Sequence, residues 1–179
     1  MGRADVMVVD GALEGAVPVQ PAAAPAGIGL PALDAAMARK ALVVDLARSI
    51  DFRAGHIPGA VWGMRSRLEM LAPQLSAAPE VVLTCPDGVL AARAVPEAMR
   101  LTPAPVSALA GGTASWRRAG RALMADRTDP PDEACVDFYL RPYDRNSGIE
   151  EAMHAYLSWE IDLVAEIARD GTVVFGAPG

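Results

Sequence analysis

Apolar residues along the chain follow two alternating patterns. Continuous apolar runs rich in β-branched residues occupy positions 41–45, where Asp45 closes the run, and 81–85, as in strands that are buried on both faces of a parallel sheet. A weaker third run lies at 106–109. Apolar residues at helical spacing predict helices beside these strands, at 31–40, 64–75, 89–101 and 113–119. Because strand and helix signals alternate, the sequence predicts an α/β fold, a parallel sheet flanked by helices on both faces.

The chain divides into three segments that differ in composition and hydrophobic pattern. Residues 25–125 hold the alternating pattern and form the predicted domain. Residues 1–24 combine a short apolar strand with a Pro/Ala-rich linker, and they loosely repeat the strand-turn-helix pattern near 106–123. We therefore interpret them as a remnant of an upstream module of the same kind. Residues 126–179 form a C-terminal extension.

The extension contains an amphipathic helix, which we place at 148–170. Ser147 and Glu150 have the spacing of a capping box, and Gly171 is a typical helix stop. One helix cannot bury its own apolar face. We expect the face to pack on its own domain, or to form a contact with a second copy in a homodimer or with a neighbouring domain.

Composition excludes several classes of function. The 22 acidic residues outnumber the 16 basic ones, which gives no basic footprint for nucleic acid. Apolar runs are too short to span a membrane. The two cysteines, Cys85 and Cys135, form neither a disulfide framework nor a metal pattern. The N-terminal residues do not have the pattern of a signal peptide, so we expect a cytoplasmic protein with reduced thiols.

Two signatures and the cysteine between them point to one family. Residues 45–60 read DLARSIDFRAGHIPGA and residues 111–120 read GGTASWRRAG. Cys85 lies between them, directly after a predicted buried strand. In this order the three features resemble the rhodanese family of sulfurtransferases. The resemblance implies a rhodanese-like sheet and a catalytic cysteine at position 85.

The resemblance also implies a mechanism. Cys85 would take sulfane sulfur from a small donor, such as thiosulfate or a persulfide, and pass it from a Cys85 persulfide to a thiol or cyanide. The substrate would lie in the loop that follows the cysteine, formed by Pro86, Asp87, Gly88, Val89, Leu90 and Ala91. Inward N–H groups there would lower the pKa of the thiol. No cofactor and no metal are implied.

Three further residues are candidates for supporting roles. Asp45, at a strand end, can accept backbone hydrogen bonds from the loop that follows. His56 fits a hydrogen-bonding loop clamp better than a catalytic base. Arg93, one turn into the predicted helix, either leans toward the loop or is a solvated surface residue. Cys135 lies in an apolar setting and is interpreted as buried and inert rather than as a resolving thiol.

The loop departs from the family in its charge. Thiosulfate-using members commonly carry a cation at the sixth loop position, which is Leu90 here, and an arginine where this chain has Ala47. The loop carries an acid instead, Asp87. The alternative function is therefore a catalytically weak or inactive rhodanese-like module that binds a partner or has a regulatory role. Related phosphatases need an arginine at the position of Ala91, which argues against phosphoryl transfer.

Overall fold

The computed structural model of the chain describes residues 27–171. The predicted strand and linker at 1–24 lie outside these residues. The described elements, in chain order, are α1 (Leu30–Ala38), β1 (Leu42–Asp45), α2 (Ser49–Ala54), β2 (Val61–Trp62), η1 (Arg65–Leu71), α3 (Ala72–Ala77), β3 (Val81–Thr84), α4 (Val89–Ala98), β4 (Val106–Ala108), α5 (Gly112–Arg118), η2 (Asp132–Ala134), η3 (Pro142–Asp144) and α6 (Ile149–Asp170).

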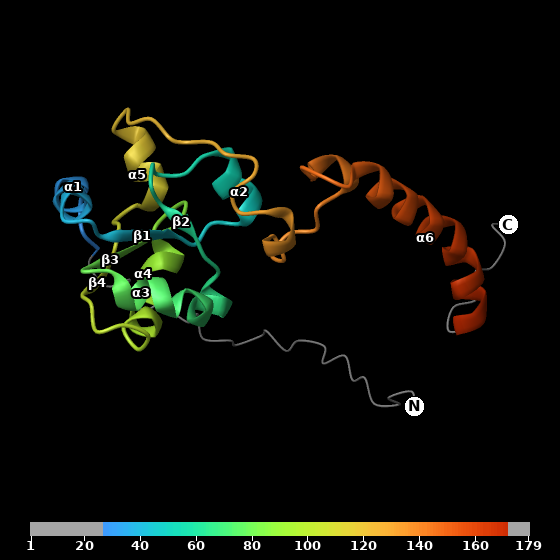
Figure 1. Cartoon of the computed structure of the whole chain (residues 1–179), viewed down its shortest axis with the longest axis horizontal. Helices are drawn as coiled ribbons and strands as arrows, with labels where there is room; N and C mark the ends of the chain where they lie inside the picture. Colours follow the sequence, from blue (N-terminus) through green and yellow to red (C-terminus); the bar gives the residue numbers. More distant parts are fainter. Residues whose placement is uncertain (1–26, 172–179) are drawn as a thin grey trace, which may run out of the picture.

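The strands form one parallel sheet in the order β2-β1-β3-β4 (Figure 1). In the register of the two central strands Leu42 pairs with Val81 and Asp45 with Thr84. Because both strands end at the same edge, the loop after β1 and the loop that begins with Cys85 emerge side by side. The predicted parallel α/β sheet is confirmed.

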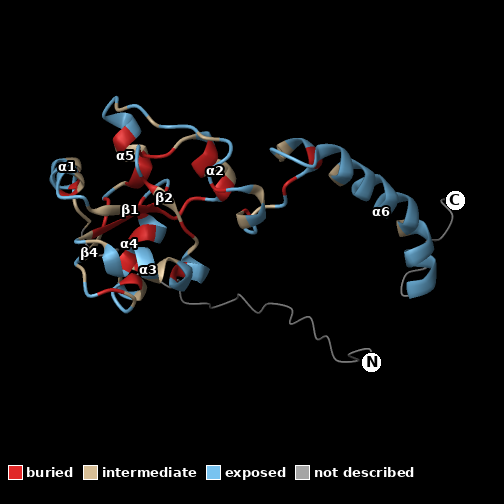
Figure 2. Cartoon of the chain, viewed as in Figure 1, coloured by how far each residue is buried: buried red, intermediate tan, exposed pale blue. Residues whose placement is uncertain are grey.

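The two faces of the sheet carry separate apolar clusters, which together form the core (Figure 2). On one face Val44 and Leu83 pack with residues of α3 and α4. On the other face Val43, Val82 and Phe52 pack with α1, α2 and α5. Alternate strand residues point to opposite faces, and both faces are buried, so continuous apolar runs are required. The predicted helices on both faces are confirmed.

Two segments differ from the sequence prediction. The helix expected at 64–75 is divided into η1 and α3, with a non-helical backbone at Arg67 (φ −137°). Pro73 starts the new helix at its first turn, where proline needs no backbone partner. Strand β2 and helix α2 were not predicted, because two and six residues are too few to show a periodicity.

Helix α6 has the expected length but a different N-terminus. Gly148, in the left-handed region at φ 64°, occupies the N-cap and no side chain caps the helix, so the predicted capping box of Ser147 and Glu150 is wrong. Gly171 ends the helix in the left-handed conformation (φ 59°), as predicted.

Most of the apolar face of α6 is exposed. Leu163 is half-buried, and the other large apolar residues are at least 37% exposed: Ile149, Met153, Tyr156, Leu157, Trp159, Ile161, Val164 and Ile167. The helix extends away from the sheet and contacts η3 (Figures 1 and 2). The expectation that this face packs on its own domain is therefore wrong, because the chain turns away from the sheet before Gly148. A homodimer or a neighbouring domain remains a prediction.

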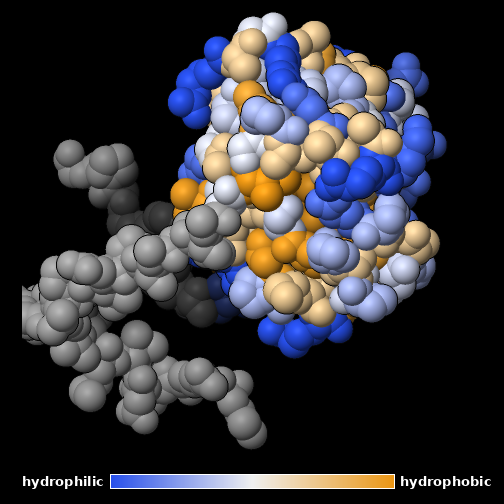
Figure 3. Space-filling view, turned by 90° about the vertical axis from the view of Figure 1, so that its left-hand side faces the viewer, coloured by the Kyte–Doolittle hydropathy of each residue, from blue (hydrophilic) through white to orange (hydrophobic). Residues whose placement is uncertain are grey.

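The end of the domain that lies away from α6 has, in its described part, no such continuous apolar face. There, apolar and charged residues are interleaved (Figure 3). Within the described residues no helix combines the length and the hydropathy that a membrane crossing requires.

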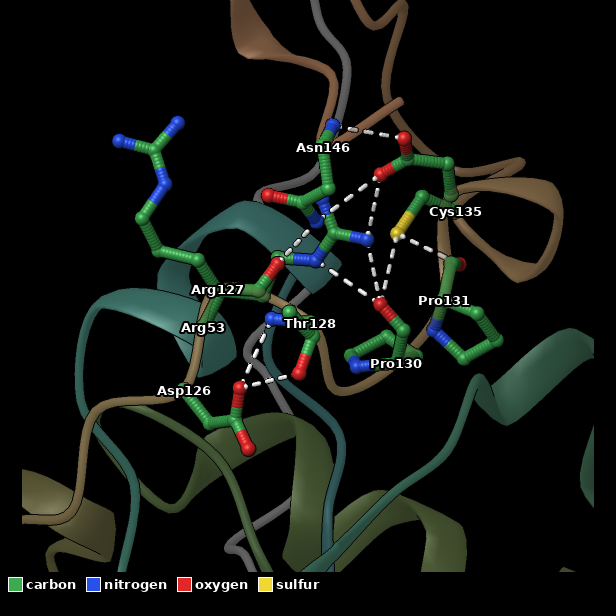
Figure 4. A network of polar contacts seen from close by, with 9 residues as sticks. Arg53, Asp126, Arg127, Thr128, Pro130, Pro131, Cys135 and Asn146 are labelled. Atoms are coloured by element: carbon green, nitrogen blue, oxygen red, sulfur yellow. Dashed lines mark hydrogen bonds and ion pairs between the residues drawn. The ribbon is translucent and has the colours of Figure 1, made fainter. Parts of the chain in front are cut away.

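A buried arginine fastens the extension to α2 (Figure 4). The Arg53 guanidinium donates to the Pro130 carbonyl at 2.9 Å and pairs with Asp132 at 2.8 Å, and both side chains are close to fully buried. Asp132 also accepts the Asn146 backbone N–H at 2.8 Å. Cys135 is buried beside this network, with its sulfur 3.4 Å from the Pro131 carbonyl. The extension from 126 to 146 is thereby held against the sheet domain.

Candidate active site

Cys85 follows β3 directly and begins a tight loop that ends in helix α4. Gly88 caps this helix in the left-handed region (φ 84°), where residues other than glycine are strained. The loop turns the backbone N–H of Ala91 toward the sulfur of Cys85, at 3.4 Å. The cysteine is 1% exposed, so the thiol lies at the bottom of the loop.

Helix α5 holds the outer side of the loop. The backbone N–H of Thr113 donates to the carbonyl of Cys85 at 2.9 Å, and that of Ala114 donates to the carbonyl of Pro86 at 3.0 Å. This close approach requires Gly112, because a Cβ at that position would collide with the Cys85 carbonyl oxygen and the Gly88 nitrogen. The GG signature thus turns loop carbonyls outward, which leaves N–H groups free to face the sulfur.

Asp87 changes the electrostatics of the thiol. The Cys85 S–H donates to the Asp87 carboxylate at 3.4 Å, and the same oxygen accepts the N–H of Val89 at 2.9 Å. Burial first, and then this carboxylate, raise the pKa of Cys85, while the N–H groups of Ala91, Gly88 and Asp87 lower it. The net direction is upward. The expected lowering of the thiol pKa is therefore wrong for the substrate-free site, because desolvation outweighs the amide groups.

Asp45 lies at the end of β1 and connects the first signature with the last. Its carboxylate accepts the N–H of Ala47 at 3.0 Å and the hydroxyl of Thr113 at 3.2 Å. The Thr113 hydroxyl also lies 3.2 Å from that of Thr84. Burial raises the pKa of Asp45 despite these donors. Asp45 thus positions Thr113, whose backbone holds the Cys85 carbonyl.

His56 lies in the core on the α2 side of the sheet. Its Nδ1 is 2.8 Å from the Phe52 carbonyl, and its ring stacks on Phe52 with centroids 3.8 Å apart. Its backbone exchanges hydrogen bonds with Met124, both at 2.9 Å. These contacts hold the GHIPGA loop to α2 and to the chain after α5. They are the contacts expected of a loop clamp.

The remaining loop candidates lie on the surface. Pro86, Asp87, Val89 and Leu90 are exposed, whereas Gly88 and Ala91 are buried. Arg93 is exposed, and its charge is among the smaller causes that lower the pKa of Asp87. Arg93 is thus near the acidic group of the loop. The structure brings the predicted loop residues and Asp45 together and places His56 elsewhere.

Sequence reasoning missed the contribution of the extension to this region. Asp137 accepts the backbone N–H of Ser49 at 2.8 Å, at the start of α2. Arg48 lies over the ring of Phe138, 5.9 Å from its centroid. The sequence signal available for this region was the charged Arg48 directly after Ala47. The contact itself joins Ser49 to Asp137, 88 residues further along the chain, and no local pattern indicates it.

Comparison with known proteins places this geometry in a family. Residues 30–119 match the model of the rhodanese-like domain. A thiosulfate sulfurtransferase from Pseudomonas aeruginosa is similar in structure, with 34% identity and a TM-score of 0.72 over 87% of this chain and 30% of that chain. This chain therefore spans less than a third of that protein.

A second solved structure is similar in fold. A rhodanese-related protein from Thermoplasma volcanium matches 56% of this chain and 98% of its own, with 20% identity and a TM-score of 0.50. No curated protein matches the chain in sequence.

Proposed function

The chain belongs to the rhodanese-like family, and we propose on this basis that it is a sulfurtransferase that carries sulfane sulfur on Cys85. The working unit in this proposal is the domain at 25–125, with 126–179 as an extension and 1–24 as the remnant of an upstream module. The reaction needs a reduced thiol, which fits the cytoplasmic location that we propose.

The proposed reaction has two steps and needs no external oxidant. The Cys85 thiolate attacks the outer sulfur of a donor, a new S–S bond forms, and the donor's own bond to that sulfur breaks. The electron pair leaves with the donor's remaining part, a thiolate or sulfite, which is protonated as its pKa requires. An acceptor thiolate or cyanide then attacks the outer sulfur of the Cys85 persulfide and releases the Cys85 thiolate.

The observation that carries the proposal is the N–H of Ala91 at 3.4 Å from the Cys85 sulfur. Together with the amides of Asp87 and Gly88 it provides a partly preorganised site for a thiolate or a persulfide anion. In this proposal Cys85 is catalytic, the residues from Pro86 to Ala91 surround the transferred sulfur, and Asp45 and His56 hold the loops in place.

The charge of the loop bears on which sulfur donor the protein uses. The similar Pseudomonas aeruginosa protein is a thiosulfate sulfurtransferase. In this chain, however, the loop has Asp87 next to the sulfur and Leu90 at its end. A dianionic donor would meet a carboxylate where a cation would form charge-assisted hydrogen bonds. We therefore propose a small sulfur donor other than thiosulfate as the better substrate, and a thiol as the acceptor.

The charge of the loop also favours a second candidate function. A catalytically weak or inactive rhodanese-like module would bind a partner or have a regulatory role through the same loop. The raised pKa of Cys85 favours this alternative, because less of the reactive thiolate is present near neutral pH.

Turnover measurements distinguish the two functions. Thiocyanate formation from cyanide, and persulfide transfer to dithiothreitol, are followed with thiosulfate and with cysteine persulfide as donors. The proposal predicts turnover with at least cysteine persulfide and its loss in Cys85→Ser, whereas Cys135→Ser retains it. Turnover that survives in Cys85→Ser, or none with either donor, supports the binding module instead.

A further inference from the structure

A cleft lies between the Cys85 loop and the extension. It has a volume of about 520 Å³, and its walls come from the chain after β1, the start of η1, helix α4 and the extension. Its lining includes Leu46, Arg48, Arg65, Leu90, Glu97 and Asp137. Leu90 lies in the first turn of α4, at the end of the Cys85 loop and next to Ala91, whose N–H faces the sulfur. The cleft therefore borders the end of the Cys85 loop.

The extension fixes one wall of this cleft. Asp137 is held by the backbone N–H of Ser49 at 2.8 Å, and Phe138 lies beneath the Arg48 guanidinium. The Arg53 network holds the chain that leads to both residues. A carboxylate from outside the sheet domain is thus positioned at the edge of this cleft.

The charges of the cleft are balanced. Arg48 and Arg65 supply two guanidinium groups, and Glu97 and Asp137 supply two carboxylates. Arg65 pairs with Glu97 at 2.5 Å, and Arg48 with Asp51 at 2.8 Å. Asp137 accepts a backbone N–H and interacts with the charge of Arg48, but among the described residues it forms no direct salt bridge. It is the carboxylate that is best placed to bind a ligand cation.

We infer that the sulfur donor is a zwitterionic persulfide of an amino-acid-type thiol, whose organic part occupies this cleft. This inference rests on the proposed function. The ligand's ammonium group binds Asp137, its carboxylate lies toward Arg48, and its methylene contacts Leu46 and Leu90. Asp87 adds a negative charge beside the sulfur, which disfavours a dianion but less so a persulfide of small net charge. Asp137 is accordingly a specificity-determining residue.

The test compares two donors that differ by one ammonium group. Cysteine persulfide carries both charges, whereas the persulfide of 3-mercaptopropionate carries the carboxylate alone. Asp137→Asn keeps an oxygen that accepts the Ser49 N–H but removes the charge. We expect this substitution to raise the KM for cysteine persulfide about tenfold, with kcat and the KM for the mercaptopropionate donor little changed. Asp162→Asn on α6 is the control and should leave both donors unaffected.

Two different failures are distinguishable in this experiment. If wild-type Cys85 acquires no sulfur from either donor or from inorganic polysulfide, the proposed function fails and the inference with it. If Cys85 is loaded, but Asp137→Asn changes both donors equally or neither, the proposed function stands and the zwitterionic donor is wrong.

Discussion

The Asp87 carboxylate lies 3.4 Å from the sulfur of Cys85 and accepts its S–H. The same oxygen also accepts the N–H of Val89, which would otherwise be available to a bound anion. Asp87 therefore stabilises the protonated thiol and occupies part of the anion site. The loop has inward N–H groups that would bind an anion, but Asp87 favours the neutral, protonated form of the Cys85 thiol.

Removing this charge should make Cys85 more reactive. Because the carboxylate raises the pKa of Cys85, Asp87→Asn should lower that pKa and increase the thiolate fraction at neutral pH. We expect the rate of alkylation by iodoacetamide at about pH 7 to rise roughly threefold to tenfold. The rate measured against pH should show its midpoint at lower pH than in the wild type. A midpoint that stays in place or rises would mean that burial alone sets the pKa.

The contact between Gly112 and the Cys85 loop makes a prediction about stability. In Gly112→Ala the new methyl group collides with the Cys85 carbonyl oxygen and the Gly88 nitrogen. Gly120→Ala is the matched control, since Gly120 also has a positive φ (73°) but nothing within 4 Å of the new atom. The control should cost about 1 kcal/mol of unfolding free energy through backbone strain. We expect Gly112→Ala to cost at least about 2 kcal/mol more than that.

Urea denaturation of both alanine variants measures this difference. Equal losses in the two proteins would show that the loop tolerates a shift away from α5. In that case the GG signature would serve only the backbone angle.

The buried ion pair of the extension should contribute far more to stability than an exposed one. Arg53→Met leaves the buried Asp132 carboxylate and the Pro130 carbonyl without the guanidinium that they share. We expect a loss of about 3–5 kcal/mol. Arg39→Met breaks the pair with Glu80, in which the arginine side chain is 60% exposed, and should cost less than about 1 kcal/mol. Comparable midpoints in chemical denaturation for the two variants would contradict this account of the extension.

Asp45 should make the fold less stable as pH rises. A salt-bridged acid, whose pKa is lowered, has the opposite effect. Its pKa is higher in the folded protein than in the unfolded chain, so the stability that it contributes is present at low pH and decreases as pH rises through the folded value. Asp45→Asn mimics the neutral form. The variant should be more stable than the wild type by about 1 kcal/mol near pH 7, and this difference should shrink toward about pH 3. A variant that is less stable near neutral pH would show that the hydrogen bonds from Ala47 and Thr113 need the charge.

Sequence reasoning predicted the sheet and the position of Cys85 directly after a strand, because these depend on local pattern. The runs around Val44 and Leu83 are buried on both faces and are therefore apolar throughout. The loop after Cys85 likewise has short-range backbone requirements, such as the positive φ of Gly88. The pKa of the thiol was predicted in the wrong direction, since burial of the sulfur depends on how α4 and α5 close over the loop.

The contribution of the extension could not be predicted in the same way. Asp137 reaches Ser49 over 88 residues, and Arg53 reaches Asp132 over 79 residues. Contacts of this length depend on how the chain after α5 returns to α2, which no periodicity encodes. The exposed face of α6 shows the converse: the helix was predicted from its pattern, but the exposure of its apolar face was not.

The most direct test of the account is to find where transferred sulfur is attached. The intact protein is treated with cysteine persulfide, excess donor is removed, remaining thiols are alkylated, and the peptides that contain each cysteine are analysed by mass spectrometry. The account predicts one additional sulfur atom on Cys85, none on Cys135, and loss of that atom when a thiol acceptor is added. Sulfur on Cys135, or a Cys85 that is never modified, would contradict it.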